Sequence, residues 1–258
     1  MAIKQFNNTA IESRFEAGLP NDYRKSDVER LLRLVLSGRF SQLISLPGGG
    51  KATLLKLLVY NEHLRKFHLG ERGKSVRFVY FNLLELPNLE QTTINKSILL
   101  SLKETMEQFS NETIPTDPLI LSQQLKDTVN QLTNEGQTTL VLLFDHFDEF
   151  QNELPRSFFQ TLRSLRSLGK YKFSCVFATR RDLQELVDPE LIQTFYDFFV
   201  GNTVYMNLSD ETALTFIRSQ VEGAIGKKLN NAENDKIIAL TGGHTKLFRV
   251  CLETILRD

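Results

Sequence analysis

The 258-residue sequence has no net charge, no long apolar run and only two cysteines. Its 31 lysine and arginine residues balance 31 aspartate and glutamate residues, so no global electric field directs the chain toward nucleic acid or membrane. No apolar run approaches the roughly 18 residues that a membrane span requires, and the first residues lack a basic segment followed by an apolar one. We therefore expect a soluble, cytoplasmic protein without membrane contact.

Several kinds of chemistry are excluded by missing motifs. Cys175 and Cys251 lie in an apolar run and a helical pattern, which predicts reduced core residues rather than a disulfide. The four histidines and two cysteines show no CxxC or HExxH spacing, so no metal-only catalytic site is predicted. No GxSxG sequence is present, so covalent catalysis has no support. The 41% of apolar residues are enough to bury one large α/β core.

Five short runs rich in β-forming residues recur along the chain, each separated from the next by enough residues for a helix. They are 40–46, 76–82, 139–145, 173–179 and 203–207. This alternation is typical of a parallel sheet with helices on its faces. The third and fourth runs show no polar alternation, as expected for central strands that are covered on both sides.

A glycine-rich turn follows the first of these runs. Residues 47–51 read PGGGK, and the next segment has leucines on one helical face. Strand, glycine loop and helix in this order are the context of a phosphate-binding P-loop. Glycines let successive amides converge on an anion, the helix N-terminus adds partial positive charge, and Lys51 reaches the β- and γ-phosphates. The predicted nucleotide-binding residues of the loop are Pro47, Gly48, Gly49, Gly50, Lys51, Ala52 and Thr53.

Two positions depart from the GxxxxGK[ST] pattern of such loops. Ser45 stands where the first glycine belongs, and Ala52 stands where a hydroxyl would bind Mg²⁺. Thr53 is one residue further, about 100° around the helix, and could bind the metal only if the loop shifts. We therefore predict a weakened Mg²⁺ site. The alternative is that the glycines form an ordinary strand-to-helix turn.

An acidic group follows the third run. Asp145 ends this run at the carboxyl edge of the sheet, where open α/β sheets bind ligands, so it is predicted with Thr53 as a metal ligand. Asp148 and Glu149 follow closely and are candidate general bases for the activation of water. His146 stands where many P-loop ATPases have glutamate. We interpret it as a neutral histidine with a local hydrogen bond. Alternatively, Asp145 caps a loop and the other two carboxylates begin the next helix.

The fourth run ends in Thr179, Arg180 and Arg181. A cationic group at this strand end can sense a γ-phosphate and balance its charge. Arg180 is the candidate, with a surface salt bridge as the alternative. The predicted catalytic set is therefore Asp145, Asp148, Glu149 and Arg180.

The motifs divide the chain into three predicted parts: an N-terminal extension over the nucleotide (1–25), a P-loop NTPase core (26–207) and a helical lid subdomain (208–258). The last part has a purely helical pattern. The predicted fold class is α/β, a P-loop NTPase three-layer sandwich with a five-stranded, mainly parallel sheet. Because the chain ends on a helical pattern without a stop signal, we expect it to continue there, or to dock a protein partner or a second copy.

The motifs resemble the STAND branch of the AAA+ and related P-loop ATPases, in particular prokaryotic ATPase domains of that type and the NACHT group. The likeness covers roughly residues 20–256 and is carried by SLPGGGKATLL, LVLLFDHFDEF and VFATRRD, in that order. It implies a core in which the strand at 173–179, the sensor strand, lies between the P-loop strand at 40–46 and the acidic strand at 139–145. It also implies ATP as the nucleotide, with its exchange or hydrolysis used as a signalling switch.

Two further segments are similar to parts of that family. TGGHTKLFRV resembles its GGxP element, which implies an adenine-side position for His244, although Thr245 replaces the proline. DYRKSDVERLL resembles the N-terminal stretch that packs over the base, with Tyr23 and Arg24 as candidates. Adenine rather than guanine is implied by the resemblance, and no guanine-reading NKxD sequence is present.

Three functions stay open from the sequence. The first is an ATP-dependent conformational switch with weak or absent hydrolysis, because loss of a general base typically costs about 10² to 10⁴-fold in rate. The second is a DNA-associated, initiator-like AAA+ ATPase, suggested by basic clusters at 163–181 and 65–77. Leucines within both clusters favour solvated helix faces instead, so nucleic acid is the less favoured partner. The third is a pseudo-ATPase scaffold that uses the nucleotide as a structural ligand or does without it.

Overall fold

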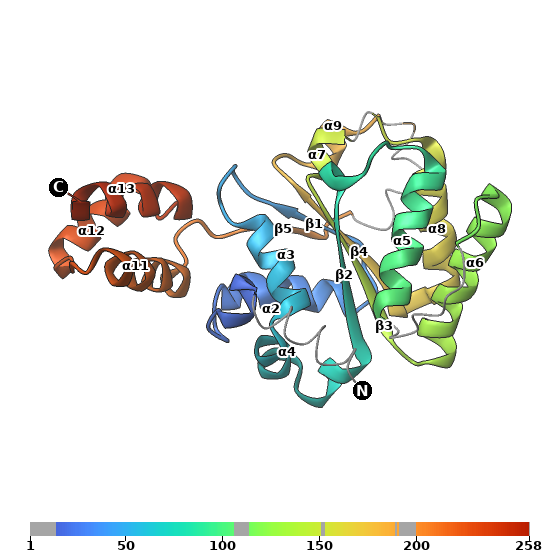
Figure 1. Ribbon diagram of the computed structural model, residues 1–258, viewed down its shortest axis with the longest axis horizontal. Coiled ribbons are helices and arrows are strands. Elements are labelled where there is room, and N and C mark those ends of the chain that lie inside the picture. Colours follow the sequence, from blue (N-terminus) through green and yellow to red (C-terminus); the bar gives the residue numbers. More distant parts are fainter. Residues whose placement is uncertain (1–13, 106–113, 151–152, 189, 191–199, 258) are drawn as a thin grey trace.

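The computed structural model describes residues 14–105, 114–150, 153–188, 190 and 200–257. Its described part contains a sheet wrapped by helices and a helical unit at the C-terminal end (Figure 1). Of the predicted N-terminal extension, the first 13 residues lie outside the described residues. Within the described part, no helix is both long and apolar enough to cross a membrane.

The sheet consists of β1 (Ser41–Ile44), β2 (Val76–Asn82), β3 (Thr139–Asp145), β4 (Phe173–Thr179) and β5 (Thr203–Tyr205). Each strand coincides with a predicted run or lies inside one. The strands are hydrogen-bonded in the order β2-β3-β4-β1-β5, and every pairing is parallel. The predicted fold class is therefore confirmed, and β4 lies between β1 and β3 as the family resemblance implied.

The register of the strands brings their carboxyl ends to one edge of the sheet. Asp145 of β3 pairs with Asn82 of β2, and Thr179 of β4 pairs with Ile44 of β1. Every residue of β4 and all but Thr139 of β3 are buried, because helices cover both faces. The chain therefore leaves β1, β3 and β4 side by side, at the edge where the predicted site residues follow.

Different helices cover the two faces of the sheet (Figure 1). Alternate residues of a strand point to opposite faces, so Val141 and Leu143 of β3 belong to one apolar cluster and Leu142 and Phe144 to the other. The first cluster includes residues of α2 (Lys25–Val35), α3 (Lys51–Tyr60) and α4 (Glu62–Leu69), and the short helices η1 (Phe15–Gly18) and η2 (Gly70–Ser75) adjoin it without contributing a residue. The second includes residues of η3 (Leu83–Glu85), α5 (Gln91–Thr105), α6 (Pro118–Asn130), η4 (Gln131–Glu135), α7 (Phe147–Phe150), α8 (Arg156–Gly169) and α9 (Leu183–Leu186). The short helix η5 (Lys170–Lys172) links α8 to β4.

Helix α2 begins differently from the sequence prediction. Serine and aspartate are preferred N-cap residues, so the sequence predicts a cap at Ser26 or Asp27. This prediction is wrong, because Arg24 is the N-cap residue and has a left-handed conformation with φ 51°. Asp27 is buried in the first turn, where its carboxylate accepts from Arg24 and from the amide of Asn207. The aspartate therefore serves a contact that is distant in sequence rather than its own helix end.

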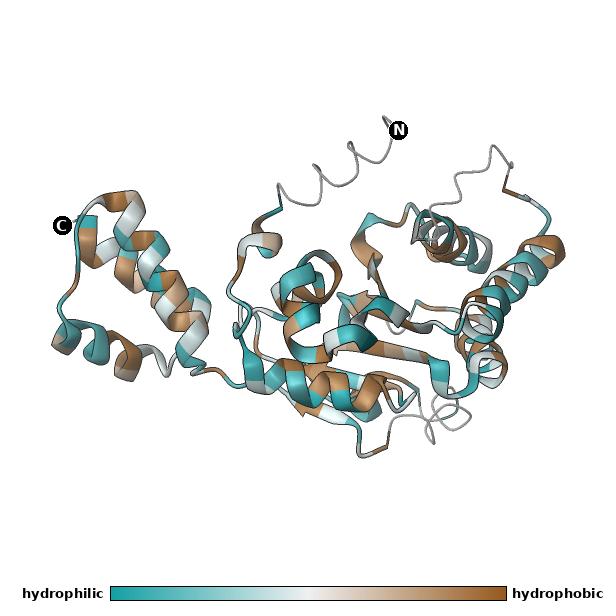
Figure 2. Cartoon of the chain, turned by 90° about the horizontal axis from the view of Figure 1, so that it is seen from below, coloured by the Kyte–Doolittle hydropathy of each residue, from teal (hydrophilic) through white to brown (hydrophobic). Residues whose placement is uncertain are grey.

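The C-terminal helices form a unit beside the core (Figure 2). They are α11 (Glu211–Ile225), α12 (Asn231–Thr241) and α13 (Thr245–Arg257), and the chain reaches them from β5 through residues 206–210. Leu214, Val221, Phe248 and Leu252 belong to an apolar cluster of this unit alone. An Asn230–Glu233 capping box begins α12. The unit thus has its own small core, and the N-terminal residues of α11 and α13 contact Arg24 and the glycine loop.

Candidate functional site

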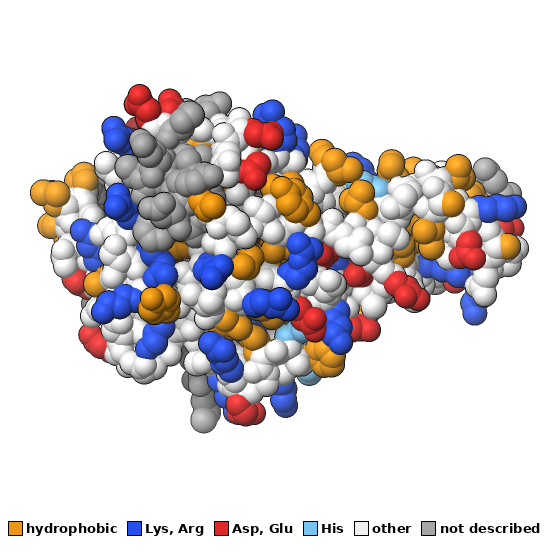
Figure 3. Space-filling view, turned by 180° about the vertical axis from the view of Figure 1, so that it is seen from behind, with side chains coloured by type: hydrophobic (Ala, Val, Ile, Leu, Met, Phe, Trp, Pro, Cys, Tyr) orange, Lys and Arg blue, Asp and Glu red, His pale blue; other side chains and the backbone are white. Residues whose placement is uncertain are grey.

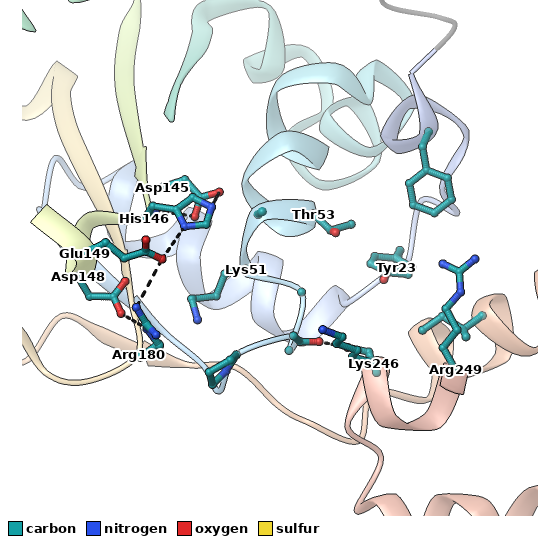
Figure 4. A pocket seen from close by; sticks show the side chains of 18 residues that line it. Tyr23, Lys51, Thr53, Asp145, His146, Asp148, Glu149, Arg180, Lys246 and Arg249 are labelled. Carbon is teal, nitrogen blue, oxygen red and sulfur yellow. Dashed lines mark hydrogen bonds and ion pairs between the residues drawn. The ribbon is translucent and has the colours of Figure 1, made fainter. Parts of the chain in front are cut away.

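A cavity of about 500 Å³ opens at the carboxyl edge of the sheet, between the core and α13 (Figure 4). Its lining includes the predicted loop residues 47–53 and the four predicted catalytic residues, Asp145, Asp148, Glu149 and Arg180. These residues come from segments that follow three neighbouring strands, β1, β3 and β4. The sheet topology therefore brings together what the sequence distributes over more than 130 residues.

The glycine loop turns into α3 through two residues with left-handed backbone. Gly48 and Gly50 have φ angles of 80° and 96°, which strain any residue with a Cβ atom. The amide of Leu54 donates to the carbonyl of Gly50 at 2.9 Å. The amides of residues 51–53 therefore belong to the first helical turn, where N–H groups have no acceptor within the helix. They supply the partial positive charge that anions prefer.

Lys51 lies between this turn and the acidic residues. Its Nζ donates to the carbonyl oxygen of Ser45 at 2.6 Å, within its own loop. Burial lowers the pKa of Lys51, whereas the carboxylates of Asp148 and Asp145 raise it. The lysine and the acidic group predicted to act with it thus share one electrostatic environment.

The carboxylate of Asp145 accepts two hydrogen bonds. The hydroxyl of Tyr80 donates to Oδ2 at 2.7 Å, and the amide of His146 donates to Oδ1 at 2.9 Å. Burial, together with the bond to Asp145, raises the pKa of Tyr80. The His146 ring has a local partner as predicted, since its Nδ1 lies 3.1 Å from Oε1 of Glu149. The sequence reasoning missed Tyr80, whose signal is a tyrosine near the end of the strand beside β3.

Arg180 is paired with both candidate general bases. Its Nε donates to the Asp148 carboxylate, and its Nη2 lies 3.5 Å from Oε1 of Glu149 (Figure 4). The side chain of Asp148 is 7% exposed, so the Asp148 carboxylate in this ion pair is largely shielded from water. An ion pair with a guanidinium occupies carboxylate oxygens that would otherwise be open to a water molecule. Arg180 therefore restrains the residues that would activate water.

Comparisons with solved structures agree with this arrangement. The chain is similar to a Walker-type ATPase of Pyrococcus abyssi, with a TM-score of 0.62, 14% identity, and coverage of 91% of this chain and 67% of that one. It is also similar to the Aeropyrum pernix Orc1 protein in complex with DNA, with a TM-score of 0.57, 15% identity and coverage of 97% and 64%. Its fold is that of a P-loop ATPase.

The similarity extends to Cdc6p from Pyrobaculum aerophilum, with a TM-score of 0.50, 16% identity and coverage of 81% of this chain and 52% of that one. At these identities the comparisons show the P-loop ATPase fold alone. This chain spans between 52% and 67% of the length of the three solved chains. No family model and no curated protein sequence matches it.

In this P-loop ATPase fold, the side chain of Ser45, just before the glycine loop, lies close to Gly49. A Cβ atom added to Gly49 would lie 2.0 Å from the Ser45 hydroxyl oxygen, a distance that no real contact reaches. Among the described residues that hydroxyl has no hydrogen-bond partner and is buried. A side chain at position 49 would therefore require the Ser45 hydroxyl to rotate away, and its Cβ atom would still lie 3.0 Å from the carbonyl oxygen of Leu46.

The two predicted metal ligands, Asp145 and Thr53, lie on different segments that line the same cavity. Thr53 lies on the far side of Lys51 from Asp145 and turns toward Tyr23 (Figure 4). The part of the chain that the structure describes has no cluster of three His, Cys, Asp or Glu side chains able to hold a metal ion. Ala52 brings no hydroxyl, and both oxygens of Asp145 already accept hydrogen bonds. The weakened Mg²⁺ site at Asp145 and Thr53 therefore stays a prediction.

The three residues that the family resemblance placed near the base have different positions. Tyr23 is buried and lines the cavity. Arg24 and His244 lie behind the loop, where Nη2 of Arg24 donates to the carbonyl of Gly49 at 2.8 Å and Nε2 of His244 bonds the carbonyl of Pro47 at 2.9 Å. Of these three residues, Tyr23 lines the cavity, whereas Arg24 and His244 contact carbonyl oxygens of the glycine loop.

Thr245 also binds the back of the P-loop. Its hydroxyl donates to the carbonyl of Gly48 at 2.9 Å. The proline that the related element has at this position has no side-chain donor for such a bond. With threonine in place of proline, this segment thus gains a hydrogen bond between α13 and the P-loop.

Four cavity residues were missed by the sequence reasoning. Lys246 and Arg249 of α13 add two cations, and Phe15 and Ile217 add apolar surface. Phe15 is 57% exposed, and its ring packs edge-on against Phe216 with centroids 5.9 Å apart. A spacing of three residues on α13 marks Lys246 and Arg249 as neighbours, but which side faces the core depends on how the helical unit packs.

Proposed function

We propose that this domain binds ATP in the cavity at the sheet edge and uses the nucleotide as a conformational switch with weak or absent hydrolysis. The observation that carries the proposal is the composition of that single cavity. One part has the glycine loop, the first turn of α3 and Lys51, and another part has Phe15, Tyr23 and Ile217. Such a combination suits a ligand with a polyphosphate at one end and an aromatic ring at the other.

The two ends of the cavity suggest how ATP lies in it. The phosphates would follow residues 48–53, with Lys51 toward Arg180 and the carboxylates. The adenine would lie toward Phe15 and Tyr23, whose rings offer faces and edges for stacking. Lys246 and Arg249 of α13 would add positive charge from the helical unit.

Weak hydrolysis is supported by the state of the acidic residues. Asp148 and Glu149 are paired with Arg180, and Asp145 already accepts from Tyr80 and from the amide of His146. A water molecule would have to compete with Arg180 for the oxygens of the Asp148 and Glu149 carboxylates. Loss of general-base catalysis reduces rates by about 10² to 10⁴-fold.

The switch is supported by the contacts between the helical unit and the loop. His244 and Thr245 bind the carbonyls of Pro47 and Gly48. A change in the conformation of the loop would therefore change the position of α13. The DE pair after Asp145 supports assignment to the STAND and NACHT subtype. We also propose a cytoplasmic location and a protein partner, or a second copy of the chain, as the recipient of the signal.

Titration with ATP, ADP and GTP tests the proposal. Thermal unfolding of the purified chain is followed with and without Mg²⁺, and ATP at 100 times its Kd should stabilise the fold by about 2.7 kcal/mol. GTP should have a smaller effect, and single-turnover hydrolysis should be slow. No stabilisation by any nucleotide would refute ATP binding, whereas rapid hydrolysis would refute the weak-catalysis part. Stabilisation that does not change with Mg²⁺ would favour the scaffold function.

A second candidate is a DNA-associated, initiator-like ATPase, as the resemblance to a protein solved with DNA suggests. Lysine and arginine side chains spread over one broad face of the core with few acids among them (Figure 3). Near β4, Arg166 lies 5.4 Å from the ring of Tyr171, which is 75% exposed between Lys170 and Lys172. Cations around an exposed aromatic ring suit a phosphate backbone.

Binding of a fluorescent DNA duplex at increasing salt tests this candidate. If this face binds DNA, the affinity should fall steeply as the salt concentration rises. The slope of log affinity against log salt concentration should correspond to several phosphate contacts. Lys170→Glu should lower both the affinity and the slope, whereas Lys74→Glu, in the other basic cluster, should leave them unchanged. Absence of binding at low salt would remove the candidate.

A further inference from the structure

Arg24 is a cation enclosed between the P-loop and the connection to the helical unit. Its side chain is 0% exposed, and its backbone adopts a left-handed conformation that is unusual for a residue other than glycine. It lies just before α2 and does not line the cavity. A buried guanidinium needs several acceptors, so its partners show what it holds.

The partners of Arg24 belong to three separate segments. Its Nη2 donates to the carbonyl of Gly49 at 2.8 Å, and its Nη1 donates to the carbonyl of Asn207 at 2.8 Å and to Oδ2 of Asp27 at 3.1 Å. The amide of Asn207 in turn donates to Oδ1 of Asp27 at 3.2 Å. The Arg24–Asp27 pair therefore holds both backbone polar groups of Asn207, within the connection from β5 to α11.

The bond to Gly49 fixes the direction of an amide that faces the cavity. In a trans peptide the C=O and the following N–H point in opposite directions. Because Arg24 binds the Gly49 carbonyl from behind the loop, the amide of Gly50 points to the other side. Gly50 lines the cavity, and a Cβ atom on it would lie 3.5 Å from Nε of Arg24. That Nε is buried and has no partner among the described residues.

We propose that Arg24 is a positioning residue that couples phosphate binding at the P-loop to the connection leading to the helical unit. The proposal rests on ATP binding in the cavity. One guanidinium binds Gly49 and Asn207 together, so rotation of the Gly49–Gly50 peptide on a phosphate changes the contacts of Asn207. The backbone amide of Arg24 also donates to the hydroxyl of Thr212 in α11, at 3.2 Å. Coupling between two sites is reciprocal, so movement of the connection also changes phosphate affinity.

The test compares ATP affinity with hydrogen exchange at the Asn207 amide. In the unmodified chain, ATP should change the exchange rate of that amide several-fold. Arg24→Lys keeps the charge but loses the planar fork that reaches two segments, so its ATP affinity should fall about tenfold or more. Exchange at Asn207 should then no longer respond to ATP.

Arg30→Lys is the matched control. Arg30 lies on α2, is exposed and donates to the carbonyl of Tyr205 at 3.1 Å, but it touches neither the loop nor the cavity. Its variant should bind ATP like the unmodified chain and keep the response of Asn207. If Arg24→Lys does not fold, Asp27→Asn replaces it, because an amide keeps an acceptor for Asn207 while losing the charge that holds the guanidinium.

The outcomes separate the coupling from ATP binding itself. If the unmodified chain binds no nucleotide, the proposed function fails first. If it binds ATP and the exchange of Asn207 does not change, the coupling is refuted without any variant. The coupling is equally refuted if Arg24→Lys, or Asp27→Asn in its place, keeps full affinity together with the response at Asn207.

Discussion

Replacement of Lys51 by methionine is expected to lower ATP affinity by at least about 100-fold while leaving the fold intact. Hydrogen bonds to charged groups contribute about 1.5–3 kcal/mol each, and a P-loop lysine reaches two phosphates. The fold should tolerate the change, because Lys51 is partly buried and its one hydrogen bond ends on Ser45 in the same loop. Methionine keeps the length and apolar character of the side chain without an ammonium group that burial disfavours.

The same variant predicts a change in how stability depends on pH. Burial lowers the pKa of Lys51 in the folded chain below its ordinary value of 10.5. The unfolded chain then binds more protons than the folded one, so stability contributed by this group rises as the pH rises from the lowered pKa toward 10.5. Lys51→Met should lose this rise.

Thermal unfolding with and without ATP, repeated at several pH values, measures both effects. Lys66→Met is the control, since Lys66 is exposed on α4 and does not line the cavity. It should keep the stabilisation by ATP. A Lys51→Met protein that ATP stabilises as strongly as the unmodified chain would show that the glycine loop does not hold the phosphates.

The parts of the site that the sequence predicted are those fixed by local spacing. Gly48, Gly50 and Lys51 follow a strand directly, so their conformation is set within a few residues. Asp145 was predicted for the same reason, because it ends an apolar run. The parallel sheet followed from alternation of runs, whereas the order of its strands came from the family resemblance and not from any pattern in the residues.

The residues that sequence reasoning misplaced act through distant backbone groups. Arg24 binds the carbonyl of Asn207, which is 183 residues away, and His244 binds that of Pro47 at a separation of 197. Every residue has a carbonyl, so no residue type marks the partner. The cap at Asp27 was mispredicted on the same physical ground, because the Asp27 carboxylate accepts from the amide of Asn207, which is 180 residues away, as well as from the nearby Arg24.

Truncation of Phe144 to alanine is expected to destabilise the fold by about 3–5 kcal/mol. The side chain is 1% exposed, and its ring stacks on those of Phe81 and Phe177 at centroid distances of 5.4 and 5.5 Å. A third ring, that of Phe158 in α8, meets it edge-on at 5.5 Å. Removal leaves a cavity in the middle of the sheet that strands bonded on both sides cannot close by moving.

Denaturant unfolding measures this effect, and Phe67→Ala supplies the comparison. Phe67 is 54% exposed on α4, so its truncation should change stability by only about 0.5 kcal/mol. Because Phe144 immediately precedes Asp145, the variant also separates core packing from site geometry. If the folded fraction of Phe144→Ala binds ATP with unchanged affinity, the hydrogen bonds from Tyr80 and His146 suffice to hold the carboxylate. A loss of affinity beyond the loss of folded protein would mean that the aromatic layer beneath the sheet edge positions Asp145 as well as stabilising the core.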